Sequence, residues 1–149
     1  MSRNFGSLTT NGEIALSAAT AKTVLQLVAP ANTILAVHGF EVSFDGVSNT
    51  AEPVIIQLLR QTTAGTATSR TPLKTKDRST ALAATGSENA SAEPTAGDIL
   101  KTFHVHPQAG VVYPFTLDGE LELPGGGRLG LKLTAPASVN TLATINFEE

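Results

Sequence analysis

The last fifty residues constrain the fold more than any other part of the chain, because they alternate apolar and polar side chains in five short runs. A period of two places the apolar side chains on one face of a β-strand. Turn-forming residues separate the runs, as at Asp118-Gly119 and Pro124-Gly-Gly-Gly127. Five strands leave no room for a helix here. We therefore predict a core of packed sheets, with strands at 98–106, 111–117, 120–123, 128–133 and 139–147.

Upstream residues continue this pattern, with predicted strands at 13–16, 22–28 and 33–44. Gly39 is predicted to mark a bulge or a bend in the third of these. The alanine-rich residues 15–21 are also compatible with a helical turn. Residues 54–60 are mostly apolar and suit either a buried helix or a central strand, and their β-branched side chains and short length favour the strand.

Two segments lack this periodicity. Residues 1–11 are rich in Ser, Thr, Asn and Gly, and we predict an N-terminal arm outside the core. Residues 62–94 contain few large apolar side chains, and we predict a long excursion with a short edge strand at 73–76. Residues 12–149 then form a single domain. The predicted fold is an all-β, antiparallel β-sandwich, jelly-roll-like, with eight or nine strands.

Composition excludes several kinds of chemistry. The chain has no cysteine, which rules out disulfides, thiolate metal sites and cysteine nucleophiles. No apolar run approaches the roughly 20 residues of a membrane span, and residues 1–5 lack the apolar core of a signal peptide. We therefore expect a soluble chain with no membrane partner. The net charge of −3 argues against nucleic-acid binding. Residues 60–78 are the exception, with five basic side chains against one acidic.

A pair of histidines is the first candidate for chemistry. His104 and His106 flank Val105, so on a strand both imidazoles face the same side, as in some metal sites. His38 is a possible third ligand from a neighbouring strand. Cupins use such a pair, but a glutamate follows within a few residues in their pattern, whereas here the next acid is Asp118. The sequence favours a surface position for the pair, and we predict no metal and no cofactor.

Two other motifs also favour a structural interpretation. Asp118, Glu120 and Glu122 share one face by alternation, and paired carboxylates can hydrolyse glycosides. No aromatic residue alternates with them to stack a sugar, which favours a solvated face. Pro124-Gly-Gly-Gly-Arg128 has the composition of a phosphate loop, but a strand follows it where such loops need a helix. We predict no catalytic residue and no enzyme activity.

Five stretches carry a resemblance to a known group of proteins. They are Ala21-Lys-Thr-Val-Leu-Gln-Leu-Val-Ala-Pro30, Phe40-Glu-Val-Ser-Phe-Asp-Gly46, Leu59-Arg-Gln-Thr-Thr-Ala-Gly65, Ala92-Glu-Pro-Thr-Ala-Gly97 and Pro124-Gly-Gly-Gly-Arg-Leu-Gly-Leu-Lys-Leu-Thr-Ala-Pro136. Over most of residues 20–149 the chain resembles small all-β proteins encoded in tailed-phage structural gene clusters. In size and class it is similar to their capsid decoration (cement) proteins. The shared motifs are turns and strand edges.

The resemblance implies a virion protein that is made in the host cytoplasm and seated on the outside of an icosahedral head. There a homotrimer would bind the major capsid protein and stabilise the shell. The acidic net charge is consistent with a position away from the packaged genome. Other classes remain open: a phage tail or fibre component, a carbohydrate-binding β-sandwich module, and a cupin-like metalloenzyme.

Two sets of residues are candidates for partner binding. We expect Phe5 and Leu8 to anchor the N-terminal arm on an adjacent subunit or on the shell. We expect the basic side chains of the excursion to dock on acidic groups of the shell, where charge would orient and speed association; these are Arg70, Lys74, Lys76 and Arg78.

Overall fold

The computed structural model describes residues 3–46, 52–76 and 80–149, and within them it contains strands and no helix. The described strands are β1 (Phe5–Thr9), β2 (Ile14–Leu16), β3 (Ala21–Val28), β4 (Leu35–Phe44), β5 (Val54–Gln61), β6 (Thr66–Ser69), β7 (Leu73–Lys74), β8 (Thr85–Ala92), β9 (Ala96–Val105), β10 (Val111–Pro114), β11 (Leu121–Leu123), β12 (Arg128–Thr134) and β13 (Val139–Glu148).

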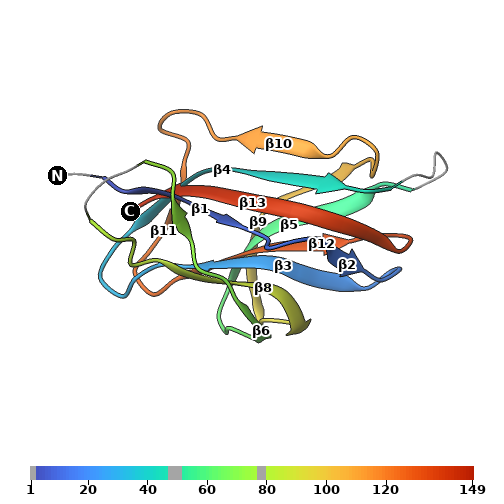
Figure 1. The fold of residues 1–149 in the computed structure, drawn as a ribbon, viewed down its shortest axis with the longest axis horizontal. Coiled ribbons are helices and arrows are strands. Elements are labelled where there is room, and N and C mark those ends of the chain that lie inside the picture. Colours follow the sequence, from blue (N-terminus) through green and yellow to red (C-terminus); the bar gives the residue numbers. More distant parts are fainter. Residues whose placement is uncertain (1–2, 47–51, 77–79) are drawn as a thin grey trace.

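The strands form two antiparallel sheets that pack face to face (Figure 1). The seven-stranded sheet has the order β10-β4-β13-β1-β7, with β11 also pairing with β4 and β2 with β13. The six-stranded sheet has the order β6-β8-β3-β12-β5-β9. Apolar side chains from both sheets fill one core between them. The predicted all-β sandwich is therefore confirmed, and the strand at 54–60 is confirmed in place of a helix.

A bulge in β4 lets two large residues on that strand face the core. Val37 and Phe40 are both buried although they lie three positions apart, which strict alternation forbids. Against β13 the register passes from Gly39 to Val37, so His38 is the extra residue. One extra residue shifts the alternation by one position. The bulge predicted at Gly39 is confirmed, and it adds His38 to the outer face of the seven-stranded sheet.

The prediction of an N-terminal arm outside the core is wrong. β1 lies between β13 and β7, and it pairs with β13 from Phe5 opposite Glu148 to Thr9 opposite Thr144. Leu8 is fully buried in the core. A Cβ added at Gly86, on the other sheet, would lie 2.6 Å from the Leu8 Cδ1 atom, so this side chain joins the two sheets.

Periodicity missed β1 because the positions that face inward offer little apolar contrast. They are Gly6, Leu8 and Thr10, of which only the leucine is large and apolar. Adjacent backbone is also tied down, since Asn4 and Glu149 exchange two hydrogen bonds of 2.9 Å. The first and last strands therefore lie side by side in one sheet (Figure 1).

The predicted excursion at 62–94 is more ordered than the sequence suggests. The edge strand expected at 73–76 is confirmed as β7, at 73–74. The same stretch also contributes β6 and the eight-residue β8, which pairs with both β3 and β6. Small residues allow this: Gly86 on β8 leaves the space that Leu8 occupies. With these strands the described count is above the predicted eight or nine, and the jelly-roll description stays a prediction.

A cluster of polar side chains lies buried in the six-stranded sheet. Gln26 donates hydrogen bonds from Nε2 to Gln61 Oε1 at 2.7 Å and to the Thr63 carbonyl at 3.0 Å. Gln61 donates in turn to the Thr23 hydroxyl, which donates to Glu93. Gly130 makes room for this cluster, since a Cβ there would lie 2.3 Å from the Gln61 amide carbon. The cluster fastens the connections after β5 and β8 to the sheet.

Candidate interaction surfaces

One edge of the seven-stranded sheet is basic. β7 forms this edge and carries Leu73 and Lys74, both exposed. The Thr75 amide donates to the Phe5 carbonyl at 2.9 Å, which continues the pairing with β1 and brings Lys76 alongside. We call Leu73, Lys74 and Lys76 the basic edge. Two of the four basic residues predicted to bind a partner thus lie together on a strand edge.

The other predicted partner-binding residues are placed differently. Arg70 is half-buried, and its Nε donates to the Thr9 carbonyl at 2.7 Å, so it helps to hold the chain against β1. Arg78 lies outside the described residues. Phe5 is half-buried between the Lys76 ammonium, 3.8 Å from its ring centroid, and the His38 ring, whose centroid is 5.8 Å away. Leu8 is in the core, so the prediction that it anchors a partner is wrong.

The opposite edge of this sheet is acidic. β10 and β11 pair one after the other along β4, and the loop between them projects from the edge. Leu117 in this loop is 89% exposed, and Asp118 adopts a positive φ of 63° at the turn. We call Leu117, Asp118, Glu120 and Glu122 the acidic edge. The three carboxylates that alternate in the sequence are therefore close in space, although only Glu122 lies within a strand.

These carboxylates border a cleft of about 710 Å³ that also receives Arg3, His38, Arg60 and Glu148. Glu148 is 5% exposed and accepts from two basic groups, Arg3 Nε at 2.9 Å and His38 Nε2 at 3.0 Å. His38 Nδ1 lies 3.9 Å from Glu120. The bulge in β4 and the pairing of β1 with β13 bring these residues together from distant parts of the sequence.

In the interior of the cleft the Glu148 carboxylate is paired with basic side chains, and at its rim the side chains are acidic. Inside it, Arg3 and His38 share the Glu148 carboxylate, which satisfies a charge that would be costly to bury alone. Asp118 and Glu122 are exposed at the rim. Among the residues that the structure describes, no group of three or more His, Asp or Glu side chains could hold a metal ion. The rim is suited to contact with basic side chains of a protein partner.

The histidine pair lies on the surface. His104 is exposed near the end of β9, and His106 follows the strand in a turn, where its Nδ1 accepts from the Gln108 amide at 3.2 Å. The two residues therefore differ in local structure, although the alternation of the sequence would place them together on one strand.

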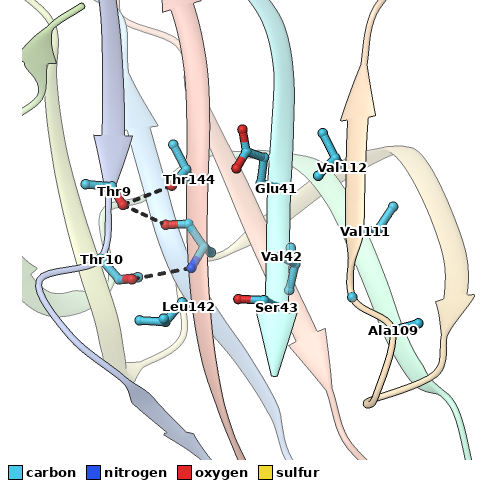
Figure 2. A pocket seen from close by; sticks show the side chains of 12 residues that line it. Thr9, Thr10, Glu41, Val42, Ser43, Ala109, Val111, Val112, Leu142 and Thr144 are labelled. Atoms are coloured by element: carbon cyan, nitrogen blue, oxygen red, sulfur yellow. Dashed lines mark hydrogen bonds between the residues drawn. The ribbon is translucent and has the colours of Figure 1, made fainter. Parts of the chain in front are cut away.

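A shallow groove of about 520 Å³ runs over the outer face of the seven-stranded sheet (Figure 2). One row across it is set by strand register, in the order Thr9, Thr144, Glu41, Val112. The hydroxyls of Thr9 and Thr144 are 2.9 Å apart and hydrogen bond to each other. None of the residues that line the groove is aromatic, so it offers no platform for stacking a sugar ring.

Comparisons with known proteins identify no relative: no protein-family model, curated protein or solved structure matches the chain. In the part of the chain that the structure describes, no helix is long and apolar enough to cross a bilayer.

Sequence reasoning found both groups of charges but missed their geometry. It did not find Glu148, Arg3 or His38 as partners, because these residues meet only through the register of three strands. The one available signal was Glu148 itself, an acid that directly follows the alternating run 139–147.

Proposed function

We propose that this protein is a structural component of a phage virion, which binds the outer surface of the capsid as an oligomer and stabilises the shell. On this proposal it is a decoration protein with a jelly-roll-like sandwich, it forms a homotrimer, and its partner is the major capsid protein. It works through the surfaces that it presents and catalyses no reaction.

The observation that carries the proposal is the pairing of exposed leucines with charge at the edges of a firmly built sheet. Leu73 is 57% exposed beside Lys74, and Leu117 is 89% exposed beside Asp118. At a protein contact, burial of an apolar side chain contributes affinity and neighbouring charges contribute orientation. β1 and β13 pair with each other in the same sheet, and the adjacent residues Asn4 and Glu149 exchange two backbone hydrogen bonds, which suits a protein under mechanical load.

The resemblance to decoration proteins supports the same assignment, and so does the acidic net charge of −3, which disfavours contact with packaged nucleic acid. Many copies on a shell, each touching more than one shell subunit, would gain occupancy through effective concentration even if each contact is weak.

The test is to locate the protein on particles. Virions from the source of the sequence are purified, labelled with gold-conjugated antibody against this chain and viewed by electron microscopy. Labelling of heads, with a copy number of hundreds per particle by quantitative mass spectrometry, is expected. Labelling confined to tails or fibres, or an absence of the chain from particles, would refute the assignment.

A further inference from the structure

The seven-stranded sheet carries opposite charges on its two edges. The basic edge, at β7, has Lys74 and Lys76, and the acidic edge, at β11 and the loop before it, has Asp118, Glu120 and Glu122. Strands β1, β13 and β4 lie between them, so four spacings of about 4.8 Å separate β7 from β11, roughly 19 Å in all. The backbones of the two edges therefore lie on opposite sides of one sheet.

Each edge also carries one exposed leucine. Leu73 is 57% exposed and Leu117 is 89% exposed, and the latter is the most exposed of the large apolar side chains in the described residues. Each edge thus combines an apolar side chain with charges of a single sign. Surfaces of this composition are complementary to each other and not to themselves, because like charges would face each other across a symmetric contact.

We propose that the basic edge of one copy docks against the acidic edge of a second copy, in a head-to-tail contact. This inference deepens the proposed function, because it names the contact that would build the oligomer, and it assigns the basic edge to a second copy in place of acidic groups on the shell. Head-to-tail contacts build a closed ring when the rotation per copy closes, and an open chain when it does not.

The contact is modest in strength for one pair of copies. An exposed ion pair contributes about 0–1 kcal/mol, so two or three of them orient the contact more than they stabilise it. Burial of Leu73 and Leu117 adds the apolar contribution. Both copies carry −3, but at physiological salt charges more than about 8 Å apart are largely screened, so the local pairs outweigh the net repulsion. Ring closure would strengthen the assembly, because each copy then makes two contacts.

The experiment is sedimentation velocity of the isolated chain at pH 7, over a range of protein concentrations and at low and high salt. The wild-type chain is expected to show concentration-dependent oligomers that weaken as salt rises. The double variants Glu120→Lys/Glu122→Lys and Lys74→Glu/Lys76→Glu each give both edges the same sign. Each is expected to weaken association about tenfold or more.

Reversing the charges of both edges in one variant distinguishes this contact from nonspecific charge effects. The quadruple variant, with both edges reversed, keeps the net charge of −3 and is expected to associate again. A control variant, Glu13→Lys/Asp98→Lys, changes net charge as much as Glu120→Lys/Glu122→Lys does, but at exposed positions away from both edges. It is expected to associate like the wild type. Circular dichroism melts verify that every variant is folded.

The outcomes separate this contact from the proposed position on the capsid. A folded quadruple variant that fails to recover association overturns the head-to-tail contact alone. A wild-type chain that stays monomeric at all concentrations overturns both this contact and the proposed homotrimer, but not the position on the capsid. If Lys74→Glu/Lys76→Glu leaves self-association unchanged but loses binding to particles, the basic edge binds the shell instead, and the proposal is likewise wrong. None of these measurements in solution depends on where the protein lies on a virion.

Discussion

The two sheets treat polar groups in opposite ways. In the six-stranded sheet, Gln26 and Gln61 are almost completely buried and hydrogen bond to each other. The seven-stranded sheet buries a charged side chain, Glu148, whose partners reach toward solvent, with the Arg3 side chain 75% exposed. One cluster has neutral amides at its centre, and the other is built on the Arg3–Glu148 ion pair at the border of an open cleft.

The two clusters therefore differ in role. The amide cluster holds connecting segments against the six-stranded sheet, whereas the cluster around Glu148 lies at the protein surface. Hydrogen bonds between buried neutral groups are insensitive to salt, so the amides hold the connection after β5, at Thr63, under any ionic condition, whereas the connection after β8 is held through the Glu93 carboxylate. Ion pairs near the surface weaken as salt rises. The seven-stranded sheet therefore carries the part of the molecule whose stability depends on its surroundings, and it is also the sheet with the two charged edges.

The largest loss in the free energy of unfolding is expected in the apolar core, and it is the reference for the smaller losses expected at the two polar clusters. Leu8→Ala removes a fully buried side chain that links the two sheets, and it is expected to lower the free energy of unfolding by about 3 kcal/mol. Urea unfolding of the variant and of the wild type measures this. Leu73→Ala, at an exposed leucine, serves as the control and is expected to have little effect; a loss of similar size in both would contradict the burial of β1.

Gln26→Leu tests the amide cluster. The substitution removes the donor to Gln61 and to the Thr63 carbonyl, and the loss is expected to be about 2 kcal/mol, because buried acceptors remain without this partner. The same urea unfolding at 0.05 M and 1 M NaCl is expected to give the same loss. Gln57→Leu makes the same chemical change at a half-exposed position of the same sheet. If the loss in stability caused by Gln26→Leu depended on salt, the two clusters would respond to salt alike and the contrast drawn between the sheets would be wrong.

Glu148→Gln tests the ionic cluster. It keeps the size of the side chain but removes the charge shared by Arg3 and His38, and a loss of about 1 kcal/mol is expected at low salt. This loss is expected to shrink at 1 M NaCl, unlike that of Gln26→Leu. Glu122→Gln, at the exposed rim of the same cleft, is the matched control. Equal losses at both salt concentrations would show that the charge of Glu148 is not what stabilises the cluster.

The smallest effect is expected at Asp45, an exposed carboxylate of the seven-stranded sheet. Hydrogen bonds from the Asn140 backbone amide and side chain, both 2.8 Å, lower the pKa of Asp45 from its usual 3.8. A lowered pKa in the folded state means that the carboxylate stabilises the fold above the unfolded pKa, and that this contribution is lost as pH falls through the folded pKa. Asp45→Asn is therefore expected to lower the melting temperature slightly at pH 7, with the difference fading as the pH falls below 3.8 and through the lowered pKa of Asp45. A difference that persists in acid would contradict this cause.

The alternation of apolar and polar residues in the sequence was sufficient to predict much of the fold. β12 buries a leucine at every second position, and β13 buries Ala143, Ile145 and Phe147 in the same way, a period that indicates a strand with one buried face. β1 and β8 escaped prediction because small residues occupy several of the positions that pack inward, Gly6 in β1 and Gly86 and Ala90 in β8, so the contrast between the two faces is too small to detect. Such strands form because neighbouring strands supply the hydrogen bonds and the large side chains.

The charged residues were visible in the sequence, but their arrangement was not. Asp118, Glu120 and Glu122 are neighbours in the chain, so their proximity was predictable. Glu148 meets His38 across 110 positions of sequence, and the contact depends on a bulge and on strand register. Sequence periodicity carries no information about which strands pair, so the cleft and the opposite signs of the two edges emerge only in three dimensions.

The division of one sheet edge between β10 and β11 has a practical consequence. Each of these strands is held by its own hydrogen bonds to β4, at Gly39–Val42 and at Leu35–Val37. The residues between them can therefore be lengthened without moving either strand. A foreign peptide inserted after Leu117 would be displayed on the outside of the molecule, with the fold beneath it unchanged.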